Sequence, residues 1–174
     1  LFFTLFINSI LKAEVVKNII INGNDRISSE TIIMFSKIEL NQNLSDIKIN
    51  QILKDLYNTN FFDNVSVKIN KNLLTINVVE APIIDKVVIS GIKANKYKEP
   101  IEKKLILKSR YSFNQFLLSS EIKNIKSILR SMGFYFATVE PYMETMKNNM
   151  INLEYKINIG KKAKIKKITF IGDK

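Results

Sequence analysis

The sequence predicts an α+β protein made of tandem copies of one small unit, in the order strand, helix, helix, strand, strand. The first observation is a short apolar strand that runs into a glycine three times, at Gly23, Gly91 and Gly172. Apolar residues stand seven, four and two positions before each glycine, so the last two share one face of a strand. The second observation is that helical and then alternating apolar patterns follow both the first and the second glycine.

The repeat interval sets the expected domain boundaries. The three glycines are 68 and 81 residues apart, and a pattern that recurs at such intervals indicates an array of small domains. We expect a first unit over residues 14–81, a second unit over residues 82–161 and the first strand of a truncated third unit over residues 162–174.

The segment before the first unit predicts a secretory signal. Residues 1–11 are nearly all apolar, and Lys12 and Ala13 follow them. Such a run is too short for a transmembrane helix but fits the apolar region of a signal peptide with a small residue before the cut. We expect residues 1–13 to be a signal-peptide remnant cleaved after Ala13. The alternative is a membrane anchor that begins further upstream.

The first unit contains two predicted helices. Ser28 fits an N-cap, with Ile27 and Ile32 placed to pack across it, and this helix should extend to about Ile38. A second helix should start at Ser45, because apolar residues then recur at helical spacing and predict one stripe that faces a sheet. The stripe consists of Ile49, Ile52, Leu53, Leu56 and Tyr57.

Similar signals predict the helices of the second unit. Pro100 suits the first turn of a helix, and apolar spacing predicts a long helix from about residue 114 to residue 132. Gly133 then stands at the cap position that Asn60 occupies in the first unit. The aromatic run at residues 134–136 follows this cap and should contribute to the core and to hairpin packing.

A closing hairpin is predicted in each unit. Residues 65–70 and 74–78 alternate between apolar and polar side chains across an Asn-rich turn. Residues 136–143 and 151–159 form the corresponding pair in the second unit.

Composition excludes several kinds of chemistry. The chain has no Cys and no His, so thiolate metal sites and histidine acid/base chemistry are excluded. We found no catalytic constellation, no nucleotide-binding glycine motif and no metal site, and we expect neither a cofactor nor enzymatic activity. The net charge is +11, and only three of the 27 basic residues are Arg, which disfavours specific reading of nucleic acid. The charge fits solvated faces, an anionic membrane surface or an acidic partner.

The ordered motifs resemble POTRA domains, the periplasmic modules of the outer-membrane protein assembly factor BamA and its relatives. Three segments carry the resemblance, at residues 56–65, 79–84 and 133–139, together with the glycine that ends each first strand. The resemblance covers about residues 15–174. Asn60 and Asn43 stand where the family commonly has Gly, and both should tolerate a left-handed backbone.

The resemblance implies tandem POTRA-like units, each with two helices packed on a three-stranded mixed sheet whose second strand lies at an edge. It also implies a periplasmic scaffold of an outer-membrane assembly machine that binds unfolded β-barrel precursors and accessory lipoproteins. The outer membrane would be reached through a C-terminal barrel that lies outside this sequence. An edge strand offers backbone groups to any extended partner, whatever its side chains.

Two edges are therefore candidate binding sites. We favour the edge in the first unit, because Pro141 removes a donor from the edge in the second. Ordinary hairpin edges that contact only solvent or a neighbouring unit are the alternative. The favoured edge consists of Val65, Ser66, Val67, Lys68, Ile69 and Asn70, the second edge of Ala137, Thr138, Val139 and Glu140, and the expected inter-unit junction of Glu80, Ala81 and Pro82.

Other functions were weighed against this one. A relative that exports proteins, of the two-partner-secretion type, has the same modules. An anchored division scaffold of the FtsQ kind carries one such unit, so the tandem repeat argues against it. A basic RNA-binding module of the KH type needs two glycines separated by two residues between its helices, and no glycines here are so placed. We therefore expect no nucleic-acid partner.

Overall fold

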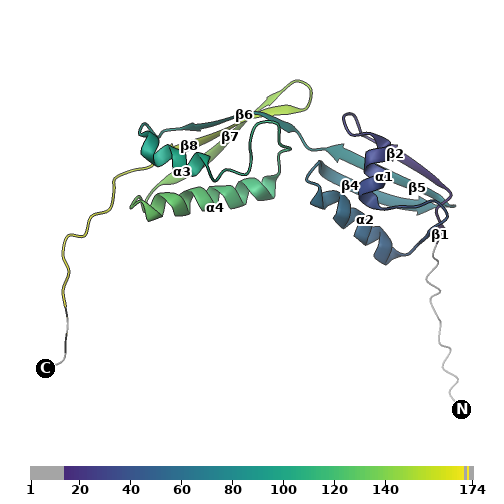
Figure 1. Cartoon of the computed structure of the whole chain (residues 1–174), viewed down its shortest axis with the longest axis horizontal. Coiled ribbons are helices and arrows are strands. Elements are labelled where there is room, and N and C mark those ends of the chain that lie inside the picture. The colour runs from purple at the N-terminus through teal and green to yellow at the C-terminus, as the bar shows by residue number, and fades with distance from the viewer. Residues whose placement is uncertain (1–13, 171, 173–174) are drawn as a thin grey trace, which may run out of the picture. The chain divides into compact units, whose positions relative to one another are not determined.

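The computed structural model describes residues 14–170 and 172 and divides into two compact units, with the boundary between Ala81 and Pro82 (Figure 1). The predicted signal-peptide remnant lies outside the described residues. Over the described residues, no helix has the length and the apolar character needed to cross a bilayer.

The first unit contains a three-stranded mixed sheet and two helices. Its last strand is central, so the sheet order is β2-β5-β4, with β2 parallel and β4 antiparallel to β5. Two short segments, β1 and β3, form a separate antiparallel pair. The elements are β1 (Glu14–Val15), β2 (Asn18–Asn22), α1 (Ser29–Ser36), β3 (Asn43–Leu44), α2 (Asp46–Asn58), β4 (Phe62–Asn70) and β5 (Leu73–Glu80).

The core of the first unit lies between its helices and one face of its sheet. Ile32 of α1 and Leu56 of α2 pack in one cluster with Leu74 and Ile76 of β5. The opposite face carries polar side chains beside the exposed Ile20 and Val79, and the Asn77 side chain hydrogen-bonds there to side chains on both neighbouring strands. This alternation is the period-two pattern of a sheet with one covered face.

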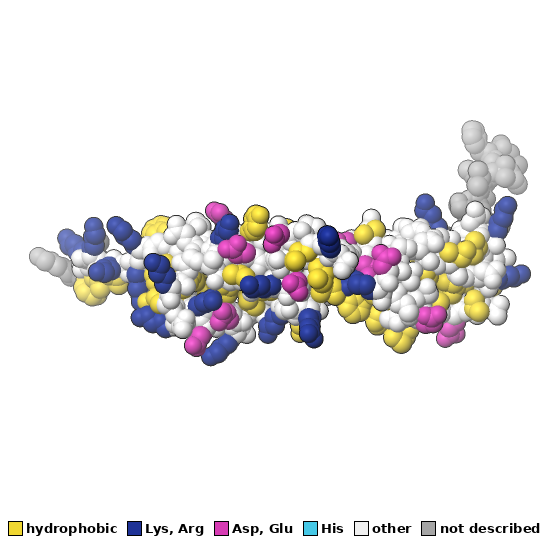
Figure 2. All heavy atoms as spheres, turned by 90° about the horizontal axis from the view of Figure 1, so that it is seen from above, with side chains coloured by type: hydrophobic (Ala, Val, Ile, Leu, Met, Phe, Trp, Pro, Cys, Tyr) yellow, Lys and Arg dark blue, Asp and Glu magenta, His cyan; other side chains and the backbone are white. Residues whose placement is uncertain are grey.

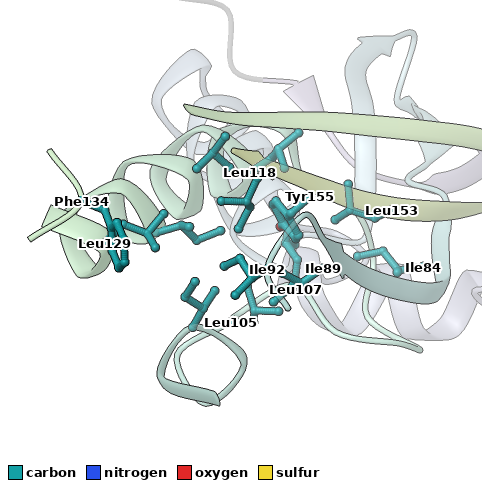
Figure 3. Packing of buried hydrophobic residues seen from close by; sticks show 14 of the residues in the cluster. Ile84, Ile89, Ile92, Leu105, Leu107, Leu118, Leu129, Phe134, Leu153 and Tyr155 are labelled. Atoms are coloured by element: carbon teal, nitrogen blue, oxygen red, sulfur yellow. The ribbon is translucent and has the colours of Figure 1, made fainter. Parts of the chain in front are cut away.

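The second unit repeats this arrangement. Its sheet order is β6-β8-β7, again with the last strand central and parallel to the first. Tyr155 and Leu153 of β8 lie in the middle of the apolar cluster, close to Ile89 of β6 and Leu118 of the long helix (Figure 3). The elements are β6 (Ile83–Ser90), α3 (Asn95–Glu102), α4 (Gln115–Ser131), β7 (Thr138–Met146) and β8 (Met150–Asn158).

The predicted helix caps are confirmed at several positions. The Ser28 hydroxyl accepts the N–H of Thr31, and the Ser45 hydroxyl accepts the N–H of Lys48. Asn60, with a φ of 58°, and Gly133, with a φ of 93°, both adopt the left-handed conformation expected where a helix ends. These local signals are readable from sequence because each partner lies within a few residues.

Two predictions about backbone conformation were wrong. α3 begins at Asn95, so Pro100 lies in the interior of the helix and not in its first turn. Pro100 cannot donate a hydrogen bond to the preceding turn, a loss that the full burial of Ile101 offsets. Asn43 is extended within β3, and the left-handed residue of that loop is Asn41, with a φ of 65°.

Two predictions about packing also need correction. Only Phe134 of the aromatic run is buried, whereas Tyr135 and Phe136 are exposed. Tyr57 is likewise exposed and lies outside the core, with its hydroxyl group at the edge strand β4. Residues 161–170 are not part of a strand in the described structure, and the truncated third unit at residues 162–174 stays a prediction. In each complete unit the first strand pairs with the last strand of the same unit, and the described residues after 160 contain no such partner.

Two of the repeated glycines lie directly against the central strand. The φ angles of Gly23 and Gly91 are 81° and 85°. A β-carbon on Gly23 would collide with the carbonyl oxygen of Val78, and one on Gly91 with the carbonyl oxygen of Ile157. Both the backbone angle and the space therefore require glycine.

Replacing Gly91 with Ala should destabilise the second unit by about 2–4 kcal/mol, because the new methyl group meets a backbone carbonyl that cannot move aside. The matched control is Gly172→Ala, since nothing lies within 4 Å of a β-carbon at that position. Urea unfolding followed by far-ultraviolet circular dichroism measures both effects. Equal stability of the two variants would contradict the assigned role of Gly91.

Candidate protein-binding edge strands

The central position of each last strand leaves two edges in each sheet. The candidate residues 65–70 lie on β4, at one edge of the first sheet, and β2 forms the other edge. In the second sheet β7 and β6 are the edges. Part of the β6 edge is covered, because Ile84 exchanges backbone hydrogen bonds with Tyr111 and Arg110.

The register of β4 shows which of its backbone groups point outward. Lys71 and Asn72, with φ angles of 49° and 66°, form a two-residue turn that joins the paired residues Asn70 and Leu73. In such a hairpin the closing pair is hydrogen-bonded and every second residue beyond it faces away from the partner strand. The backbone groups of Val65, Val67 and Ile69 therefore point away from β5.

A hydrogen bond at Val65 agrees with this register. The Val65 N–H donates to the Tyr57 hydroxyl at 3.1 Å, and that hydroxyl donates to the Asn64 side chain at 3.3 Å. Tyr57 of α2 thus covers the first outward donor of the edge. The donors of Val67 and Ile69 remain on the outer side of β4.

The side chains of β4 alternate between the core and the exterior. Val65 is buried, and Val67 and Ile69 pack partly buried against the same cluster. Ser66, Lys68 and Asn70 extend from the other face of the sheet. A strand added at this edge would therefore meet an apolar row on one face and a polar row on the other.

The β7 edge has a different character. Ala137 precedes the strand, whereas Thr138, Val139 and Glu140 belong to it. Pro141 lies opposite Tyr155 and has no N–H, so it interrupts any row of donors that this edge presents. Only Val139 of the nine residues of β7 is buried.

The residues of the expected junction are held within their own units. The Glu80 carboxylate accepts the N–H groups of Asp25, Arg26 and Ile27 at 2.9–3.0 Å and pairs with the Arg26 guanidinium at 2.7 Å. Arg26 also donates to the Ala81 carbonyl oxygen at 2.7 Å. The Pro82 carbonyl oxygen accepts the N–H of Phe113 at 2.8 Å in the second unit.

These contacts set the ionisation of Glu80. Burial alone would raise the pKa of Glu80, but the N–H donors of Ile27 and Arg26 and the guanidinium charge together hold that pKa below its ordinary value of 4.5. The carboxylate therefore stays ionised while it fixes the loop between β2 and α1. Sequence reasoning placed Glu80 in a linker and missed this role, because its partners lie more than fifty residues away.

A second buried carboxylate holds a loop in the other unit. Glu121 of α4 is 1% exposed and accepts the N–H groups of Ile106 and Leu107, the latter at 3.1 Å. It also accepts the hydroxyl hydrogen of Tyr155. Burial and the Glu121 carboxylate raise the pKa of Tyr155, so the phenol remains a donor.

The described residues hold no cluster of three or more acidic, His or Cys side chains able to bind a metal ion. Both buried carboxylates serve as acceptors for backbone N–H groups of loops. The features of these residues that could bind a partner are the sheet edges and the exposed side chains.

The two units match the family model POTRA, described as a surface antigen variable number repeat, at residues 14–81 and 82–160. The chain belongs to the POTRA family. The tandem α+β architecture expected from the sequence is confirmed by the two sheets, each of three strands with two helices.

The chain is also similar in sequence to two proteins that share one name. The chain is 27% identical over 98% of its length to the outer membrane protein assembly factor BamA of Buchnera aphidicola, and 27% identical over 91% to BamA of Neisseria meningitidis. It spans 28% and 20% of these two relatives. The similarity supports the resemblance to BamA drawn from the sequence, and the names of these relatives agree with the expected localisation at the outer membrane.

A solved structure agrees on the fold. The N-terminal domain of Omp85 from the cyanobacterium Thermosynechococcus elongatus superposes with a TM-score of 0.56 at 14% identity. The match covers 86% of this chain and 64% of that one. At this identity the likeness concerns the fold alone.

Acid should destabilise the first unit through Glu80. Because the folded-state pKa of Glu80 is lowered, its stabilisation is present above about pH 4.5 and is lost as the pH falls through the folded-state value. Glu80→Gln should cost about 2 kcal/mol at pH 7 and flatten the pH dependence between pH 5 and 3. Urea unfolding followed by NMR signals of the first unit measures both changes.

The control for this experiment is Glu39→Gln, which changes an exposed carboxylate on the same unit. It should leave the stability at pH 7 and the acid sensitivity unchanged. If Glu80→Gln kept the full pH dependence of the parent, another group would be responsible.

Proposed function

We propose that this chain is part of the periplasmic scaffold of an outer-membrane protein assembly machine and that it binds unfolded β-barrel precursors by strand addition at β4. The observation that carries the proposal is the register of β4, which turns the backbone groups of Val67 and Ile69 outward. Membership in the POTRA family and similarity to outer membrane protein assembly factors support the same role.

Strand addition suits clients that share a conformation but not a sequence. Precursors of barrel proteins alternate apolar and polar residues, and their edges are unpaired until the barrel closes. Backbone hydrogen bonds to β4 would recognise the extended chain itself, while the partly buried Val67 and Ile69 would contact alternate apolar side chains. No group of this edge needs to perform covalent chemistry, and we infer a non-enzymatic scaffold.

The first unit is favoured over the second for this role. Pro141 removes one donor from the middle of β7, and a guest strand there would leave a carbonyl oxygen without a partner. The remaining parts of the proposal are accessory lipoproteins that dock on the scaffold and a membrane-embedded barrel elsewhere in the full protein. They rest on the resemblance to BamA that the sequence shows, and this chain spans 28% and 20% of the two relatives with that name.

Val67→Pro should weaken the binding of a ten-residue peptide with alternating apolar residues at least tenfold, because the change removes an outward donor and fixes φ. Ser66→Ala and Lys68→Ala are the matched controls, since their side chains extend from the open face and their backbone groups already pair with β5. Fluorescence anisotropy with a labelled peptide measures all three. Loss of affinity in Lys68→Ala with none in Val67→Pro would assign the binding to charge.

A gain-of-function variant keeps the test independent of any folding defect. Tyr57→Phe removes the hydroxyl that accepts the Val65 N–H and makes this donor available to a guest strand. One additional hydrogen bond should raise peptide affinity about two- to tenfold. Unchanged or reduced affinity in this variant would argue against strand addition at β4.

A further inference from the structure

The two units differ sharply in charge. Residues 1–81 contain eight basic and eight acidic residues, whereas residues 82–174 contain 19 basic and eight acidic residues. The whole net charge of +11 therefore belongs to the second unit and the segment that follows it. Figure 2 shows Lys and Arg side chains crowded over the end of the chain that leads to the C-terminus.

The charge is most concentrated immediately after β8. Residues 161–167 read Lys-Lys-Ala-Lys-Ile-Lys-Lys, and all of them are exposed. No Asp or Glu occurs between Glu154 and Asp173. Nothing in this part of the sequence neutralises the five lysines, and like charges so close together repel one another unless an anionic partner is present.

This basic segment contacts Gly133 of the second unit, which directly precedes two exposed aromatic residues in the sequence. The Ala163 N–H donates to the Gly133 carbonyl oxygen at 2.9 Å, and the Lys162 side chain packs over the α-carbon of Gly133. Tyr135 and Phe136, which follow in sequence, are 59% and 82% exposed. We call residues 161–167 together with Tyr135 and Phe136 the basic–aromatic patch.

We propose that the basic–aromatic patch binds the surface of an anionic phospholipid membrane. Lysine ammonium groups are mobile point charges that suit a fluid array of phosphates, whereas fixed anionic groups are held better by the planar fork of Arg. The exposed side chains of Tyr135 and Phe136 follow Gly133, on which Lys162 packs, and they match the boundary between headgroups and acyl chains. This inference does not depend on strand addition at β4.

The combination of features favours a membrane over other anionic partners. An acidic protein surface would satisfy the lysines but would leave large exposed aromatic and aliphatic side chains in water. The patch is also Lys-rich and contains no Arg, unlike surfaces that recognise phosphates in fixed geometry. A membrane surface accepts the charged and the apolar parts together.

Vesicle cosedimentation of residues 14–174, which lack the apolar segment that the sequence predicts to be cleaved, tests the proposal. Binding to vesicles with 30% phosphatidylglycerol is expected, with none to pure phosphatidylcholine and a steep loss at high salt. The substitutions Lys161→Gln, Lys164→Gln, Lys166→Gln and Lys167→Gln together should lower partitioning by about two to three orders of magnitude, since each lysine contributes about fivefold. Lys162 is kept because it packs on Gly133.

A matched variant separates the patch from total charge. Lys17→Gln, Lys54→Gln, Lys68→Gln and Lys71→Gln remove four exposed lysines from the first unit and lower the net charge equally. This control should bind vesicles with an affinity within about twofold of the parent. Such a difference is smaller than the contribution of a single lysine at the membrane surface. Equal losses in the two variants, or no binding of the parent to anionic vesicles, would overturn the proposal.

A fluorescent reporter tests the aromatic part directly. The chain contains no Trp, so Phe136→Trp introduces a single Trp in the patch. Its emission should shift to shorter wavelength on anionic vesicles as the indole enters the interface. Emission that stays at the position seen in water, although the protein cosediments with the vesicles, would overturn the placement of the aromatic residues at the membrane.

Discussion

Each unit depends on the pairing of its last strand with two other strands of the same unit. β5 and β8 lie in the middle of their sheets and contribute an apolar row on the face that the helices cover. The first strand of each unit pairs parallel to the last strand, so the sheet is complete only when the last strand has formed. Both outer strands are left as edges by this arrangement.

The same central strands explain the repeated glycine. At Gly23 and Gly91 the chain leaves the first strand and passes directly over the backbone of the last one. A side chain at either position would push the two strands apart where they should pair. Glycine is therefore required at these positions by a contact with a residue more than fifty positions away in the sequence. Because each unit makes this contact, the glycine recurs once per unit and identified the repeat.

Local signals allowed much of the fold to be predicted. The caps at Ser28, Ser45 and Asn114 have partners within three residues, and the alternation of β4 and β5 follows directly from burial on one face. Helix α3 was misplaced because Pro100 lies inside it, where a buried Ile101 outweighs the missing donor. Tertiary packing overrides a local preference at that point.

The candidate site was predictable as an edge but not in its details. Alternation cannot reveal which residues of a strand face a neighbour, since that depends on the turn and the register. The hydrogen bond from the Val65 N–H to the Tyr57 hydroxyl depends on three-dimensional proximity. The same holds for the hydrogen bonds that distant loops donate to the carboxylates of Glu80 and Glu121. The sequence pattern placed Tyr57 in an apolar stripe and Glu80 in a linker, and it gave no signal for the role of Glu121.

The hydroxyl of Tyr57 also limits how long a guest could stay on β4. With the Val65 donor occupied, the outward groups of Val67 and Ile69 allow about four backbone hydrogen bonds, each worth about 1 kcal/mol. Four such bonds alone correspond to a dissociation constant of about 1 mM, and the entropy cost of association weakens the contact further. A chain held this weakly leaves quickly, and a scaffold of many such edges would pass a client along by rapid exchange.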